Sequence, residues 1–96
     1  MKLITEDDIF RHCRIDRGIE DEYLMDLGET AEEMVLHYLG RTADDLSAEF
    51  GQIPMGVKRA CLLVVASLYK NREMDVVQSS RLNQLFIPLI IRYRKL

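Results

Sequence analysis

The chain has 96 residues and a formal net charge of −3, with 13 Lys and Arg against 16 Asp and Glu. This length predicts one domain, over residues 1–96, with one core. The acidic start of the chain lacks the apolar region of a signal peptide, and no stretch has the length of a membrane span, so we expect a soluble protein made in the cytoplasm. Cys13 and Cys61 stand in no CxxC pattern, which argues against a disulfide framework and against a zinc site.

Charge is distributed unevenly between the two halves of the sequence. Residues 1–50 hold 5 Lys and Arg against 14 Asp and Glu, a net −9, whereas residues 51–96 hold 8 against 2, a net +6. Two explanations are open. The acidic half of one copy pairs with the basic half of another, in the head-to-tail contact that generates rings, or the two halves neutralise each other within one monomer.

The first predicted helix runs from about Thr5 to Cys13. Thr5 is followed by three acidic residues, which resembles a capping box and places carboxylates in the first turn, where the helix dipole favours them. Residues 14–18 break the helical pattern, so we expect the first helix to be separated from the second by a loop there.

A second helix is predicted from about Ile19 to Leu39, because apolar residues recur there at steps of three and four. Gly40 suits the position that ends such a helix. Gly28 costs about 1 kcal/mol relative to Ala inside a helix, and is either tolerated or allows the close approach of another backbone. The opposite face carries what we call the acidic stripe, which consists of Glu22, Asp26, Glu29 and Glu33. Packing must outweigh the repulsion between these carboxylates, or a cation must lie opposite them.

A short third helix is predicted from Ala43 to Phe50. Thr42 is followed by Asp45 three residues later, which is typical of a capping box, and Gly51 suits the position after the last helical residue. The pattern therefore predicts both ends of this helix.

The fourth predicted helix, from Pro54 to Glu73, is apolar on nearly every side. Pro54 suits the first helical position, because its fixed φ is helical and its missing N–H would have no partner there. Between residues 60 and 69 Ser67 interrupts an otherwise apolar or aromatic run, so the usual division into a wet and a dry face disappears. Such a helix must be covered on all sides, and the candidates for missing cover are other copies of the protein or a partner.

A loop over residues 74–80 and a last helix over about residues 81–93 complete the predicted elements. Pro88 interrupts the apolar pattern of that helix, so we expect a kink or two short turns near it. No alternating run requires a sheet. The sequence therefore predicts an all-α fold, a small bundle of four to five helices with one central apolar helix.

The sequence contains no recognisable catalytic or metal-binding pattern. His12 and His37 lack partners at ligand spacing, and the five glycines are scattered singly rather than gathered in a phosphate-binding loop. Neighbouring acidic residues point in different directions on a helix, so we interpret these pairs as first-turn and surface charges. The pairs are Asp7-Asp8, Glu32-Glu33 and Asp44-Asp45. We therefore expect no catalytic residue, no metal site and no cofactor.

Cations surround an aromatic ring near the C-terminus, in Arg92-Tyr93-Arg94-Lys95. This cluster is a local argument for nucleic-acid binding, although the overall acidic composition favours a solvated cluster, because a DNA-binding surface needs a basic face. A small helical regulatory or DNA-binding protein, acting as a monomer or dimer, is the alternative function. A small enzyme ranks last.

Several positions match the pattern of a known family. In the apolar helix they are Ile53-Pro54, Lys58, Ala60, Leu63, Ala66, Tyr69 and Asn71-Arg72-Glu73; elsewhere they are Thr5-Glu6-Asp7, Arg14-Ile15-Asp16, Tyr38-Leu39-Gly40-Arg41-Thr42 and Tyr93-Arg94. At these positions the chain resembles the head–tail connector proteins of long-tailed bacteriophages and prophages, also called DNA-packaging or portal-adaptor proteins. The segment from Met74 to Leu85 departs from the family pattern.

The resemblance implies a structural protein of the virion rather than an enzyme. In that family a small helical bundle assembles into a homo-oligomeric ring beneath the portal protein, extends the channel for double-stranded DNA and meets a neck or tail-completion protein. It implies a location at the head–tail junction, with DNA passing without sequence-specific binding and with no membrane contact.

Candidate interface residues follow partly from charge and partly from this resemblance. We expect part of the acidic stripe to meet the basic second half of an adjacent subunit. A second hypothesis places some acidic residues along the channel, where they repel DNA phosphates. The full set consists of Glu22, Asp26, Glu29, Glu33, Lys58, Tyr69, Asn71, Arg72, Glu73, Arg92 and Arg94.

Overall fold

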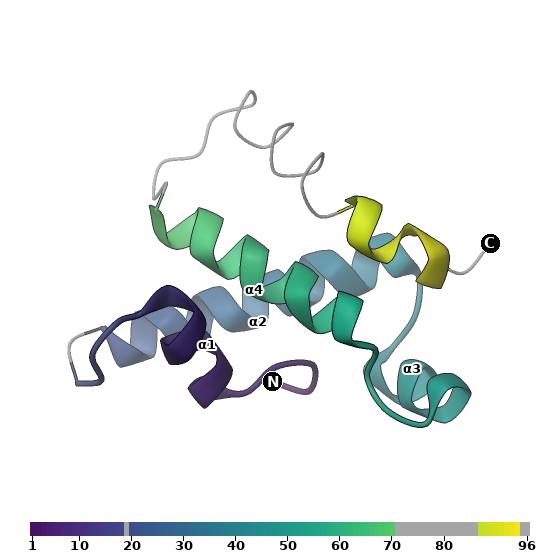
Figure 1. Cartoon of the computed structure of the whole chain (residues 1–96), viewed down its shortest axis with the longest axis horizontal. Coiled ribbons are helices and arrows are strands. Elements are labelled where there is room, and N and C mark those ends of the chain that lie inside the picture. Colours follow the sequence, from purple (N-terminus) through teal and green to yellow (C-terminus); the bar gives the residue numbers. More distant parts are fainter. Residues whose placement is uncertain (19, 71–86, 95–96) are drawn as a thin grey trace.

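The structure, a computed structural model, describes residues 1–18, 20–70 and 87–94. Its helices are α1 (Glu6–Cys13), α2 (Asp21–Leu39), α3 (Ala43–Phe50), α4 (Met55–Lys70) and the 3₁₀-helix η1 (Ile91–Tyr93) (Figure 1). Residues 87–90 are helical and lead directly into η1, and the described ranges hold no strand. The predicted all-α fold is therefore confirmed.

The two short helices α1 and α3 begin with the same capping box. In α1 the Thr5 hydroxyl accepts the Asp8 N–H at 3.1 Å, and the Asp8 carboxylate accepts the Thr5 N–H at 3.0 Å. Thr42 and Asp45 repeat these two bonds at 3.1 and 3.2 Å. Each helix has eight residues, too few to be stable by propensity alone, so each cap matters, by about 1 kcal/mol. Both predicted caps are confirmed.

The predicted ends of α1, α2 and α3 are also found. Gly40 ends α2 with φ 65°, and its N–H donates to the carbonyls of Leu36 and His37. Arg14 ends α1 in the same left-handed region, at φ 56°, which is uncommon for a residue with a Cβ atom. The chain therefore turns sharply after α1 and again after α2.

The third helix begins at Ala43 as predicted, whereas α2 and α4 begin two residues and one residue later than predicted. Helix α2 begins at Asp21 rather than Ile19, after Glu20, whose side chain makes no cap. Helix α4 begins at Met55, and the Pro54 carbonyl accepts the N–H of Val57 at 3.1 Å. Pro54 is therefore the residue before the helix and not its first residue. The predicted end of this helix at Glu73, the predicted loop over residues 74–80, and the part of the last helix before residue 87 lie outside the described residues.

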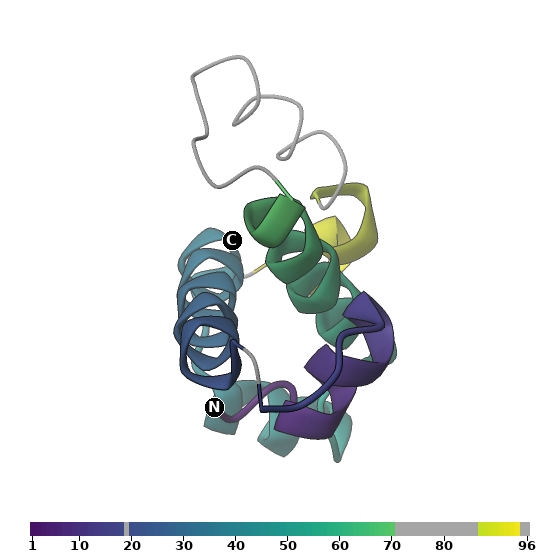
Figure 2. The same cartoon turned by 90° about the vertical axis from the view of Figure 1, so that its left-hand side faces the viewer.

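Helix α4 lies between the other elements. Figure 2 shows α2 on one side of α4, with α1 and residues 87–93 on the other. The buried face of α4 follows the helical period, with residues at alternating steps of three and one: Val57, Ala60, Cys61, Val64 and Val65. They join the buried apolar residues of α1 and α2 in one core. The prediction of a central apolar helix is thus confirmed.

Residues 87–94, which we call the C-terminal segment, pack on their own chain. Ile90 is completely buried in the core, and the Tyr93 ring meets the Phe50 ring edge-on with centroids 5.3 Å apart. A Cβ atom on Gly56 would lie 2.9 Å from the Leu89 carbonyl oxygen, so a residue without a side chain is required at this point of α4. The change from α-helix to 3₁₀-helix after residue 90 agrees with the expected break near Pro88.

Candidate interaction surfaces

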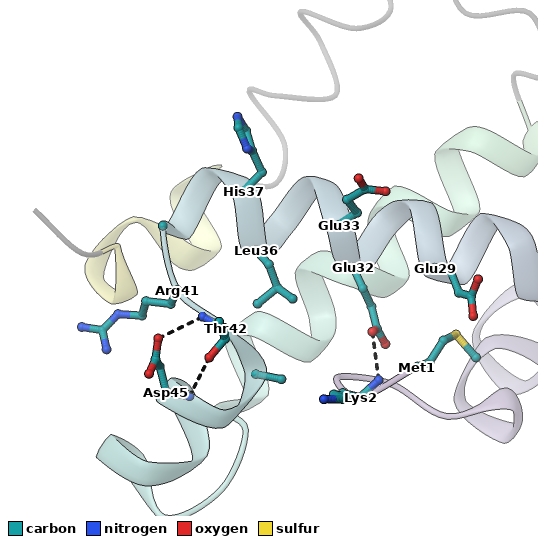
Figure 3. A pocket seen from close by; sticks show the side chains of 12 residues that line it. Met1, Lys2, Glu29, Glu32, Glu33, Leu36, His37, Arg41, Thr42 and Asp45 are labelled. Atoms are coloured by element: carbon teal, nitrogen blue, oxygen red, sulfur yellow. Dashed lines mark hydrogen bonds between the residues drawn. The ribbon is translucent and has the colours of Figure 1, made fainter.

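Glu32 anchors the N-terminal segment of the chain. Its carboxylate accepts the backbone N–H groups of Lys2 at 2.9 Å and of Leu3 and Ile4 at 3.0 Å each. The side chain is 7% exposed and points toward these residues, whereas Glu33 points away from them (Figure 3). The interpretation of Glu32 as a surface charge is therefore wrong. Its position, eight residues after Leu24 and three before Val35, both apolar, is the signal that could have placed it on the inner face of α2.

Gly28 makes room for side chains. A Cβ atom there would collide with the Met1 sulfur and would lie 2.7 Å from Cδ1 of Ile9. Of the two explanations for this glycine, close approach is confirmed, but the approaching atoms belong to side chains and not to another backbone. Gly28 and Glu32 lie one turn apart on α2, so the same face of the helix receives the side chain of Met1 and the backbone of residues 2–4.

The acidic stripe lies on the outer face of α2. All four of its carboxylates are exposed, as is His37, which continues the same line one turn after Glu33. The ion pairs that the structure describes join Arg17 to Glu6 and Asp7, and Arg41 to Glu49. These pairs all lie within the first half of the sequence, so they do not neutralise the charge difference between the halves. Within the described residues, the stripe takes part in none of them.

A pocket of about 710 Å³ opens beside this stripe. It lies between the N-terminal segment, α2 and the start of α3, and its walls include Glu29, Glu33, Leu36 and His37 (Figure 3). Arg41 also lines it, with an Nε atom that is buried and has no hydrogen-bond partner in the described part of the chain. The Glu32 carboxylate at this pocket already receives three backbone N–H groups. Among the described residues, no cluster of His, Cys, Asp and Glu side chains is arranged to hold a metal ion.

A second pocket, of about 650 Å³, opens on the side of α4 that faces α1 and the C-terminal segment. We call it the basic groove. Its lining includes four apolar side chains, of which Met55 is 60% and Leu89 39% exposed. The residues that line it are Asp8, Arg11, His12, Met55, Arg59, Leu62, Leu63 and Leu89. The groove could not be predicted from the sequence, because its residues come from three separate segments.

The structure gives some predicted interface residues partners within the chain. The Tyr69 hydroxyl donates to the Glu20 carboxylate, and its ring lies 6.3 Å from that of Tyr23, so Tyr69 joins the end of α4 to the start of α2. Lys58 is half-buried and lies near Asp8. The Thr5 backbone hydrogen bond, followed by smaller effects that include the Lys58 charge, lowers the pKa of Asp8. Asn71, Arg72 and Glu73 lie outside the described residues.

Arg92 and Arg94 are exposed, and the guanidinium of each lies over an aromatic ring of its own chain. The Arg92 guanidinium lies 5.1 Å from the centre of the neighbouring Tyr93 ring. The Arg94 guanidinium lies 4.8 Å from the centre of the Tyr38 ring, near the end of α2. Cation–π contacts at exposed sites contribute about 0.5 to 1 kcal/mol each, so the Arg94 contact with Tyr38 helps to hold the C-terminal segment against α2.

The two cysteines differ in how accessible they are, and this gives a testable prediction. Burial, with a smaller effect of the Glu32 charge, raises the pKa of Cys61 to about 12, and burial also raises the pKa of the half-buried Cys13. Because the thiolate is the reactive form, we expect Cys61 to resist alkylation at pH 8 until the protein unfolds, and Cys13 to react first. A labelling time course read by mass spectrometry checks this. Equal alkylation rates of Cys61 in the folded and the urea-unfolded protein would contradict its burial.

The raised pKa of Cys61 also predicts a dependence of stability on pH. The unfolded thiol ionises near its ordinary pKa of 9.0, whereas the folded thiol keeps its proton up to about pH 12. The folded state therefore binds more protons between these values, and the contribution of Cys61 to stability falls as the pH rises through this range. Urea unfolding at pH 8 and pH 10 measures the change in the free energy of unfolding. The Cys61→Ala variant should lack the part of this change that comes from the thiol.

These observations define a small helical protein with one acidic and one basic, partly apolar surface. Residues 4–94 match the family model described as phage gp6-like head-tail connector protein, so the chain belongs to the phage gp6-like head-tail connector family. The resemblance seen in the sequence is thereby confirmed, and membership assigns the chain a structural role as a phage head-tail connector. No curated protein and no solved structure matches the chain. None of the helices in the described ranges has the length and hydropathy needed to cross a membrane.

Proposed function

We propose that this protein assembles as a ring beneath the portal of the phage capsid, extends the DNA channel and joins the capsid to a neck or tail-completion protein. The observation that carries the proposal is the family match over residues 4–94. Charge adds support, since the acidic stripe is exposed and stands in none of the ion pairs that the described residues make.

The subunit contact proposed here joins the acidic stripe of one copy to the basic second half of the next. Lys58, Arg92 and Arg94 are candidate cations on the basic side, and the two arginines are exposed. Tyr69 supports the contact indirectly, because it holds the end of α4 against α2. Arg72 and Glu73, which with Asn71 match the Asn-Arg-Glu motif of the family, are proposed to make polar contacts that include an ion pair across subunits.

The proposed channel conducts double-stranded DNA without holding it. Carboxylates that face the channel would repel the phosphates, and the net charge of −3 agrees with weak DNA affinity. Binding of a duplex to the assembled ring at moderate salt measures this property. Tight binding would contradict a channel lined by acidic residues.

Assembly of the full chain with its portal tests the proposed function. We expect sedimentation and electron microscopy to detect a discrete ring on the portal, and expect rising salt to weaken subunit contacts, since the Debye length falls from about 10 Å at 0.1 M to about 3 Å at 1 M. A chain that stays monomeric with the portal present would contradict the ring. A ring whose assembly does not depend on salt would agree with the proposed ring but would contradict a subunit contact based on charge.

A further inference from the structure

We infer that the basic groove receives the acidic stripe of a neighbouring copy of this chain. The inference rests on the proposed ring and deepens it by naming the two surfaces that meet. Three observations carry it: the composition of the groove, the composition of the stripe, and the placement of the two on opposite sides of the subunit.

The groove combines exposed apolar surface with cations. Met55 and Leu89 are 60% and 39% exposed, so the groove presents apolar surface beside its cations. Arg11 and Arg59 are exposed at the same groove, and neither takes part in the ion pairs that the structure describes. The groove also contains the Asp8 carboxylate, which accepts the Thr5 N–H in the cap of α1 and is outnumbered by the two arginines. The groove therefore suits a partner that is both acidic and partly apolar.

The acidic stripe has the complementary composition. Its four carboxylates cover about three turns of α2, a length of about 16 Å at 1.5 Å per residue. Met25 and Leu36 are half-buried and lie three residues after Glu22 and Glu33, so apolar surface borders the carboxylates. An outer face of this kind on one helix offers apolar contact to the groove and four charges to its cations.

The placement of the two surfaces determines the symmetry of the contact. Figure 2 shows α2 on one side of α4, with α1 and residues 87–93 on the other. The acidic stripe is exposed on α2, whereas the groove is lined by residues of α1, α4 and the C-terminal segment, so the two surfaces lie on different sides of the subunit. A contact between two different surfaces is head-to-tail, so each copy uses its stripe toward one neighbour and its groove toward the other. A chain of such contacts closes into a ring when the rotation between neighbours allows it. A two-fold dimer would instead need one self-complementary surface.

Charge exchange within one chain tests the inference. The Arg59→Glu and Glu29→Lys variants should each raise the protein concentration needed for half-maximal ring assembly by about tenfold or more, because like charges then face each other. The variant that carries both substitutions places lysine opposite glutamate and should recover most of the assembly. Lys70→Glu, on α4 outside the groove, and Asp16→Lys, in the exposed loop before α2, are the matched controls and should assemble as the unmodified protein does.

The outcomes separate this inference from the proposed function. Both exchanged positions are exposed, so unfolding by urea should differ by less than about 0.5 kcal/mol between variants, which shows that folding is retained. A ring that forms normally in both single variants would overturn the inference and leave the ring standing. Loss of duplex DNA binding in Arg59→Glu without loss of assembly would overturn it too, by assigning the groove to DNA. Failure of the unmodified protein to form any ring on its portal would overturn both.

Discussion

Replacing Glu32 with alanine is expected to lower the free energy of unfolding by about 2 to 5 kcal/mol. The carboxylate accepts three backbone N–H groups, and hydrogen bonds to charged groups contribute about 1.5 to 3 kcal/mol each. Leu3 and Ile4 are buried, so their N–H groups would lose their partner away from water. Detachment of the N-terminal segment limits the loss, because water can then reach those groups at the cost of the apolar contacts of Leu3 and Ile4.

The neighbouring Glu33→Ala variant is the matched control. Glu33 is exposed on the outer face of α2, so we expect its replacement to change the free energy of unfolding by less than about 0.5 kcal/mol. Urea unfolding of the monomer compares the two variants. Amide hydrogen exchange at Leu3 and Ile4 should speed up in Glu32→Ala and stay unchanged in Glu33→Ala. Equal stability of the two variants would contradict the anchoring role of Glu32.

Replacing Ile90 with alanine is expected to cost about 2 to 5 kcal/mol, the usual range for truncating a buried isoleucine. Ile90 is completely buried and belongs to the same core as α1, α2 and α4. Because the cavity would lie between the C-terminal segment and α4, we expect the contact between Tyr93 and Phe50 to loosen as well. Urea unfolding measures the stability, and the aromatic NMR signals of Tyr93 and Phe50 report the contact.

The next residue provides the control for this prediction. Ile91 is 58% exposed, so Ile91→Ala should change the stability by less than about 0.5 kcal/mol. If the segment instead reached a neighbouring subunit, Ile90→Ala would weaken assembly while leaving the stability of the monomer unchanged. That result would contradict the packing of residues 87–93 on their own chain.

The parts of the fold that depend on neighbours in sequence could be predicted from the sequence. A capping box joins residues three positions apart, and Gly40 ends α2 through carbonyls three and four residues before it, so the residue types alone carry this information. The position of the acidic stripe was equally predictable, because the period of 3.6 residues places its four members on one face. Helix starts were less certain, since Pro54 is compatible both with the first helical position and with the position before it.

The contacts between distant segments could not be predicted in this way. The helical period was sufficient to suggest that Glu32 shares a face with Gly28, but not that residues 2–4 would lie against that face with their N–H groups pointing inward. The need for a glycine at position 56 could not be predicted, because it arises from the Leu89 carbonyl, which is more than thirty positions away in the sequence. The basic groove has the same origin, since α1, α4 and the C-terminal segment each supply only part of it.

The difference between these two kinds of contact has a consequence for the order in which the chain folds. The caps of α1 and α3 close loops of three residues, which takes well under a microsecond. The hydrogen bonds that the Glu32 carboxylate accepts close loops of 28 to 30 residues, which cost more entropy to close. We therefore expect both short helices to start forming before the chain collapses. The N-terminal segment can find its acceptor only after α2 has formed, so its attachment should be a late step in folding.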